Sequence, residues 1–200
     1  MNAELKKKLE NANSLTELED LYLPFKPKRK TKASIAIEKG LEPLAIVIYD
    51  QSSVDLKKIA LSYIDKEKGL NTLDEVLQGA RDIVAEWISE NSQIRETMRN
   101  LFIKEAFITS KVKRDKKESG SKYEIYFDAS EKLNRVPSHR LLAMLRGEEE
   151  GFLSLSIKPD SERAIRMLEK FTLKDRNTCS YQVKVATADA YQRLLQPQME

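Results

Sequence analysis

Residues 18–45, LEDLYLPFKPKRKTKASIAIEKGLEPLA, decide how this chain folds. The stretch begins with helical character, is interrupted by Pro24 and Pro27, and returns to helix after Thr31. Each proline fixes its own backbone and restricts the residue before it, so regular helix cannot run through this segment. We therefore expect a stiffened connector, and it carries five cations: Lys26, Lys28, Arg29, Lys30 and Lys32.

Two helices joined by a sharp turn are predicted after this connector. Thr31 is a suitable cap for the first helix, and Gly40 suits the left-handed position after its last turn. Pro43 falls in the first turn of the second helix, which runs to about Tyr49. This helix is apolar nearly all round, so we expect it to be buried. This helix-turn-helix-like corner is interpreted as a packed corner, because a DNA-reading helix needs a polar exposed surface.

The remaining sequence predicts a mainly α fold, a multi-helix array with one short strand. Residues 72–75, TLDE, form a capping box that opens the clearest amphipathic helix, and residues 14–17, SLTE, form another. Further helices are predicted after Ser53, after Ser92, from Ser138 to about Gly147, over 160–171 and over 180–195. Residues 152–157 alternate strictly and predict the strand. Its pairing partner is either a weaker strand of this chain or one outside it.

Composition and charge narrow the class of protein. Charged residues make up 34% of the chain, but the net charge is only +3, so any excess of cations is local. No apolar run approaches the roughly 20 residues that cross a bilayer, and the first residues are too charged for a signal peptide. A lone cysteine, Cys179, fits a reducing compartment. We expect a cytoplasmic protein with no membrane partner.

The polar basic segment 111–121 marks the best internal boundary. It suggests an N-terminal helical subdomain over 1–110 and a C-terminal helical subdomain with the strand over 120–200. One continuous core is the alternative.

No reaction chemistry is predicted, and no catalytic, cofactor-binding or metal-binding residue is assigned. His139 is expected to cap or pack, and Cys179 to be an inert, partly exposed thiol. The three glutamates 148–150 are interpreted as a solvated helix end, and Asp82 and Glu86 as an outer helix face.

Two basic segments are the candidates for binding nucleic acid. Closely spaced cations neutralise phosphates and release counterions, which gives salt-sensitive affinity without sequence preference. The second segment, 111–117, also reads as a solvated loop, which we prefer for it. The candidate residues are Lys26, Lys28, Arg29, Lys30, Lys32, Lys111, Lys113 and Arg114.

Four blocks of the sequence resemble the N-terminal helical region of the bacterial Tex transcription accessory proteins. They are LYLPFKPKRKTKA (21–33), GLEPLA (40–45), GARDIVAEWI (79–88) and PSHRLLAMLRGEEEG (137–151). The resemblance implies a longer protein with an RNase H-like domain of the YqgF type and an OB-fold RNA-binding domain, both absent here. We therefore expect a fragment cut before the YqgF-like domain, and the resemblance favours a pairing partner outside this chain for the strand over 152–157.

The resemblance implies a non-enzymatic helical scaffold of a transcription factor that binds RNA or DNA mostly through those other domains. The basic segments would add a secondary nucleic-acid surface. The alternative is a protein-protein interaction module that docks on RNA polymerase or other domains without touching nucleic acid.

Overall fold

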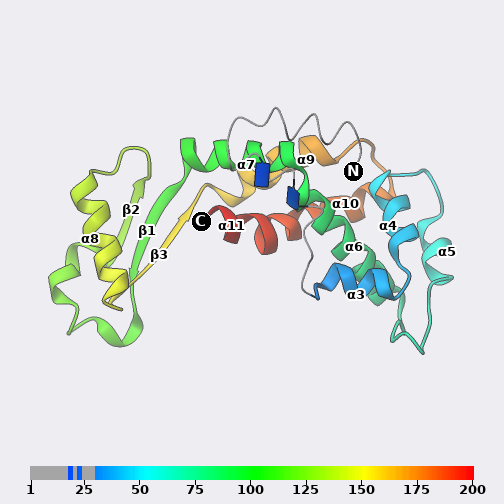
Figure 1. Ribbon diagram of the computed structural model, residues 1–200, viewed down its shortest axis with the longest axis horizontal. Helices are drawn as coiled ribbons and strands as arrows, with labels where there is room; N and C mark the ends of the chain where they lie inside the picture. The colour runs from blue at the N-terminus through cyan, green and yellow to red at the C-terminus, as the bar shows by residue number, and fades with distance from the viewer. Residues whose placement is uncertain (1–17, 20–21, 24–29) are drawn as a thin grey trace. The chain divides into compact units, whose positions relative to one another are not determined.

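The computed structural model describes residues 18–19, 22–23 and 30–200, and this part of the chain divides into two compact units. The helical unit consists of the described part of Met1–Glu96 together with Ile165–Leu195. The sheet unit consists of Thr97–Ala164 and Gln196–Glu200. In the sequence, most of the sheet unit is thus inserted between two segments of the helical unit, as the colours by residue number show (Figure 1).

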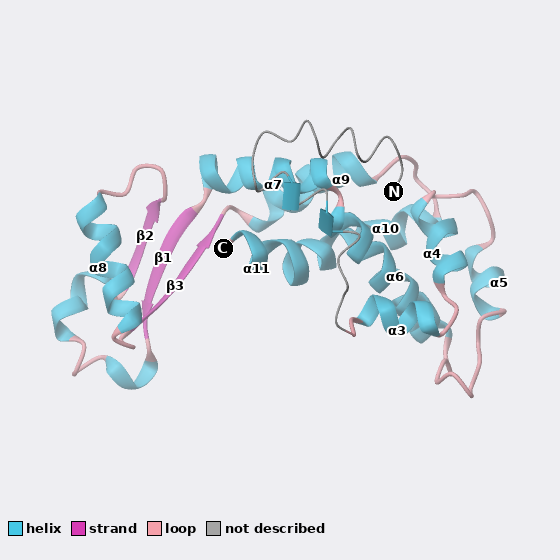
Figure 2. Ribbon diagram, viewed as in Figure 1, coloured by secondary structure: helices cyan, strands magenta, loops and turns pink. Residues whose placement is uncertain are grey.

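The helical unit is organised around α6 (Leu73–Glu90). This helix contacts α3 (Lys32–Glu38), α4 (Glu42–Tyr49), α5 (Leu56–Leu61) and α10 (Thr178–Asp189). The unit also contains the beginning of α7 (Ser92–Glu105), most of α9 (Ser161–Thr172) and the π-helical turn Ala190–Leu195. Figure 2 shows these elements in cyan.

The sequence explains why α6 is the centre of this unit. Thr72 and Glu75 form the predicted capping box, with each side chain accepting a hydrogen bond from the other residue's backbone amide. Apolar residues at helical spacing are fully buried on the same helix: Val76, Ala80, Ile83, Val84 and Ile88. Burial of this stripe is the main stabilising contribution, because most helical stability in proteins comes from tertiary packing.

The predicted corner between α3 and α4 is confirmed. Thr31 caps α3 through the amide of Ser34, and Gly40 has a φ of +86°, the left-handed conformation that glycine tolerates without strain. In α4, Leu44 and Ile48 are fully buried. Ile46, however, is 47% exposed, so the expectation that this helix is buried nearly all round is wrong.

The residue after α4 and its C-cap ties distant segments of the helical unit together. Gln51 is buried, and its φ is +57°. Its side-chain amide donates to the carbonyl of Thr172, at the end of α9, over 2.7 Å. Its side-chain oxygen accepts from the amides of Lys174 and Asp175 at 2.9 and 3.1 Å, and its backbone oxygen accepts from Asn177 at 2.7 Å. One glutamine thus fixes the connection between α9 and α10.

The sheet unit contains a three-stranded antiparallel sheet in the order β2-β1-β3. The strands are β1 (Phe107–Val112), β2 (Asp128–Lys132) and β3 (Leu153–Lys158). Helix α8 (Ser138–Glu149) packs on the sheet, and the short helices Arg114–Lys116 and Ser121–Tyr126 connect β1 to β2. The short α11 (Gln196–Met199) completes the unit.

The core of the sheet unit lies between the sheet and α8. Its buried members are Ile108, Tyr123, Tyr126, Met144 and Leu153. The two tyrosines, Tyr123 and Tyr126, are thus core residues of this unit.

The mainly α prediction and the strand over 152–157 are confirmed, but that strand pairs within the chain. The preference for a partner outside it was wrong. β1 overlaps the polar segment only at Lys111 and Val112, and its other residues follow directly on the predicted helix after Ser92. β2 reads DASEK, which lacks the apolar alternation of a typical strand.

The outer edge of β3 is protected by two carboxylates. Glu148 accepts a hydrogen bond from the amide of Leu155 at 2.9 Å, and Glu200 accepts one from the amide of Ile157 at 2.7 Å. Outward-pointing amides of an edge strand otherwise offer a template for pairing with another chain.

Several local expectations need correction. Asp55, not Ser53, caps α5, and Pro137 rather than Ser138 is the N-cap of α8, which continues past Gly147 to Glu149. Cys179 is completely buried rather than partly exposed. The predicted capping box at 14–17 lies outside the described residues. The compact units have other limits than the predicted subdomains 1–110 and 120–200, and the choice between two subdomains and one continuous core stays a prediction.

Candidate nucleic-acid interface

The first basic segment is partly described. Lys26, Lys28 and Arg29 lie outside the described residues, whereas Lys30 and Lys32 are exposed at the start of α3. The Lys30 ammonium lies 3.8 Å from the Glu38 carboxylate, with both side chains more than 60% exposed. Such a pair contributes little energy and leaves Lys30 free to exchange its carboxylate for another anion.

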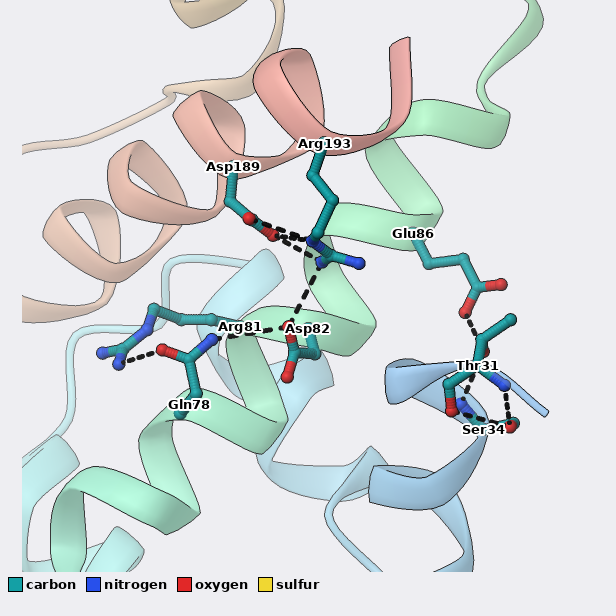
Figure 3. Close-up of polar contacts among 8 residues, drawn as sticks. All are labelled: Thr31, Ser34, Gln78, Arg81, Asp82, Glu86, Asp189 and Arg193. Atoms are coloured by element: carbon teal, nitrogen blue, oxygen red, sulfur yellow. Dashed lines mark hydrogen bonds and ion pairs between the residues drawn. The ribbon is translucent and has the colours of Figure 1, made fainter. Parts of the chain in front are cut away.

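A polar network anchors the start of α3 to α6 (Figure 3). The Thr31 hydroxyl donates to the Glu86 carboxylate over 3.3 Å. On the preceding turn of α6, Asp82 accepts from Arg193 at 3.2 Å, and Arg193 also pairs with Asp189 at 2.5 Å. Asp82 is therefore not on a solvated outer face as expected, because it is only 8% exposed.

The charge of Asp82 affects Lys32. Burial raises the pKa of the Asp82 carboxyl, while the positive charges of Arg193 and Lys32 lower it in part. Lys32 and Asp82 both line a cavity of about 380 Å³ between α3 and α6, together with Asp74 and Glu75. Lys32 thus lies in acidic surroundings, which makes it a poorer phosphate ligand than its exposure suggests.

The second basic segment has a fixed backbone. Lys111 belongs to β1, and Arg114 begins a short helix. The amide of Lys113 donates to the carbonyl of Phe152 over 2.9 Å, and the amide of Val112 donates to the carbonyl of Phe127 over 3.0 Å. The segment is therefore ordered strand and helix where a solvated loop was preferred.

Its cations are exposed and available. Five cations stand within 111–117: Lys111, Lys113, Arg114, Lys116 and Lys117. All five are exposed, and among the described residues none of their side chains forms an ion pair. Cations without an internal carboxylate partner can each neutralise a phosphate.

The two candidate segments belong to different units: Lys30 and Lys32 to the helical unit, and Lys111, Lys113 and Arg114 to the sheet unit. The sequence analysis missed Lys132 and Lys158, which stand on either side of β1 in the sheet. The signal that could have found β1 is the β-branched and aromatic content of FITSKV, residues 107–112, whereas the placement of the two lysines depends on strand register.

The other residues considered for chemistry are placed as follows. His139 is exposed in the first turn of α8, and burial raises the pKa of the Cys179 thiol, which disfavours the reactive thiolate. Within the described ranges, no three or more His, Cys, Asp or Glu side chains gather where they could hold a metal ion. No described helix has the length and apolar character needed to cross a membrane.

Comparison with known proteins links the chain to one family. Residues 51–197 match the model of the Tex central region-like family. The protein YdcI of Bacillus subtilis is 40% identical over 199 residues, which are 98% of this chain and 28% of YdcI. The transcriptional accessory protein Tex of Neisseria gonorrhoeae is 40% identical over 158 residues, 79% of this chain and 21% of Tex.

A more distant relative is the human S1 RNA-binding domain-containing protein 1. It is 28% identical over 161 residues, which are 76% of this chain and 16% of that protein. The chain thus spans only 16% to 28% of the length of these relatives.

Proposed function

Because this chain belongs to the Tex family of transcription accessory proteins, we propose that it is a non-enzymatic scaffold region whose basic segments contact nucleic acid. It would act in the cytoplasm as part of a larger factor that binds RNA or DNA. The observation that carries the proposal is the run of exposed, unpaired cations over 111–117 on an ordered backbone.

Physical chemistry supports phosphate as the ligand of this run. Ordering long cationic side chains near one another is unfavourable unless an anion offsets their repulsion, and Asp115 and Glu118 are too few to do so. Because the backbone is already fixed, binding a polyanion costs less conformational entropy than it would on a random tail. The names of the relatives, one a transcriptional accessory protein and one containing an S1 RNA-binding domain, support the same class of ligand.

The test is a salt titration of binding. Fluorescence anisotropy would follow labelled RNA and duplex DNA at increasing salt for the parent chain and for the triple variant Lys113→Ala, Arg114→Ala, Lys116→Ala. We expect the slope of log K against log salt to fall by about one for each phosphate contact removed. The matched control replaces three exposed lysines of the helical unit, Lys57, Lys58 and Lys66, and should bind as the parent does.

The second candidate function is a protein-protein interaction module that docks on the transcription machinery. Its support is exposed apolar surface in the sheet unit, where Ile125 is 70% exposed and Leu142 on α8 is 64% exposed. No binding of either nucleic acid at low salt would favour this module and refute the first proposal.

A further inference from the structure

The face of the sheet opposite the α8 core carries a distinct set of side chains. Successive residues of a strand point to opposite faces. Ile108 of β1 and Leu153 of β3 belong to the core with α8. On each strand, the residues next to these core residues, and every second residue from there, face the other way. This second face, which we call the open face, is formed by Phe107, Thr109, Lys111, Asp128, Ser130, Lys132, Ser154, Ser156 and Lys158.

The register of the strands sets the arrangement of the open face. Phe107 of the central strand is directly opposite Lys132 on one side and Lys158 on the other. Thr109 is opposite Ser130 and Ser156, and its hydroxyl donates to the Ser156 carbonyl over 3.2 Å. An aromatic residue flanked by two lysines is therefore next to a row of three hydroxyl-bearing residues.

The exposure of Phe107 is unexpected for a large aromatic side chain in the middle strand of a sheet. It is 43% exposed. Lys158 is also exposed, and Lys132 is half-buried. Phe107 is the one large apolar side chain among the nine positions of the open face, whereas protein-protein interfaces have larger apolar centres.

The same arrangement suits an unpaired nucleotide. A flat ring can stack on a base, which is sequence-tolerant because every base has a π-face. Ammonium groups on both sides can neutralise the phosphates before and after that base, and hydroxyls can donate to base or sugar oxygens. A duplex keeps its bases stacked on one another, so it cannot use the ring in this way.

The open face is also continuous with the basic segment. Lys111 is both the last open-face residue of β1 and the first cation of the 111–117 run. A strand that stacks on Phe107 can therefore continue along cations without crossing an acidic region other than Asp128.

We propose that the open face binds single-stranded nucleic acid, with Phe107 stacking on a base and Lys132 and Lys158 contacting the adjoining phosphates. The proposal rests on the proposed function, which gives the class of ligand. It adds that the nucleic acid is single-stranded and that one base stacks on an aromatic ring.

The test compares single-stranded and duplex ligands on Phe107 variants of the full chain. The probes are fluorescein-labelled oligouridine and oligothymidine of about 15 nucleotides, close to the upper site size of a small single-strand-binding fold, and a duplex of equal length. Phe107→Ala should weaken both single-stranded probes about 10-fold or more, from the loss of one stacked base. It should leave duplex binding unchanged, and Phe107→Tyr should retain the single-strand affinity.

The control is Ile103→Ala, which removes another exposed apolar side chain of the sheet unit and should bind as the parent does. Far-UV circular dichroism would confirm that each variant is folded. If Phe107→Ala binds oligouridine as tightly as the parent while the Lys113, Arg114 and Lys116 triple variant loses affinity, the open-face proposal is wrong and the proposed function stands. If the parent binds no probe at low salt, both are wrong.

Discussion

Replacing Gln51 by alanine tests whether a single side chain holds the ends of α4, α9 and α10 together. The change removes three hydrogen bonds, one to the carbonyl of Thr172 and two from the amides of Lys174 and Asp175. Thr172 is only 5% exposed, so its carbonyl is left without a partner at a cost of about 1–3 kcal/mol. The two amides lie on exposed residues and can turn to water, which adds about 1 kcal/mol together. We expect the free energy of unfolding to fall by about 2–4 kcal/mol.

The backbone at this position provides a matched control. Gln51 has a φ of +57°, and alanine there keeps the same strain, whereas glycine removes about 1 kcal/mol of it. Gln51→Gly should therefore destabilise the chain by about 1 kcal/mol less than Gln51→Ala. Gln51→Glu retains the acceptor for the two amides but cannot donate to the Thr172 carbonyl. Its stability therefore distinguishes the contribution of the donated hydrogen bond from that of the two accepted ones.

The assay is equilibrium unfolding in denaturant, followed by far-UV circular dichroism, with hydrogen exchange of the Lys174 and Asp175 amides as a local readout. An alanine variant within about 0.5 kcal/mol of the parent, the usual scatter for a surface change, would refute the reasoning. Equal losses for alanine and glycine would refute the part that concerns backbone strain.

Three further predictions concern packing, charge and the sheet edge. Gly147→Ala should lower the free energy of unfolding by about 1–3 kcal/mol, because the new Cβ would lie 2.5 Å from a methyl carbon of the fully buried Leu153. Thermal unfolding would measure this loss, and an unchanged Tm would contradict it. Burial raises the pKa of Asp82, so its ionisation removes stability as the pH rises above its ordinary value of 3.8 through the folded-state pKa. Asp82→Asn should therefore gain stability relative to the parent as the pH rises above 3.8, and a relative loss with rising pH would show the opposite shift. Glu148→Ala frees a β3 amide, and sedimentation should detect self-association that rises with concentration; a strictly monomeric variant at all concentrations would argue against an edge-protecting role.

The sequence predicted best those features whose causes are local. The capping box of Thr72 and Glu75, the apolar stripe of α6 and the left-handed turn at Gly40 each depend on residues a few positions apart. Local hydrogen bonding and helical spacing are sufficient to produce them.

Features set by distant pairing were not predictable in the same way. β2 has the sequence DASEK, and only its pairing with β1 makes it a strand. The candidate interface shows the same division: the clustering of cations over 111–117 is visible in the sequence, but the placement of Lys132 and Lys158 beside Phe107 depends on strand register. Similarly, the burial of Asp82 follows from its contact with Arg193, far along the chain.

The insertion of the sheet unit also determines the order in which the molecule can assemble during translation. α10 packs on α4 and α6, and its cap residue Asn177 bonds to Gln51 across 126 residues of chain. At translation rates of about 5–20 residues per second, the helices around α6 wait on the order of ten seconds for α10. The 97–164 segment, whose strands are close in sequence, is complete before then. The helices translated before the sheet unit, which already contact α6, thus reach their final packing only when α10 is added.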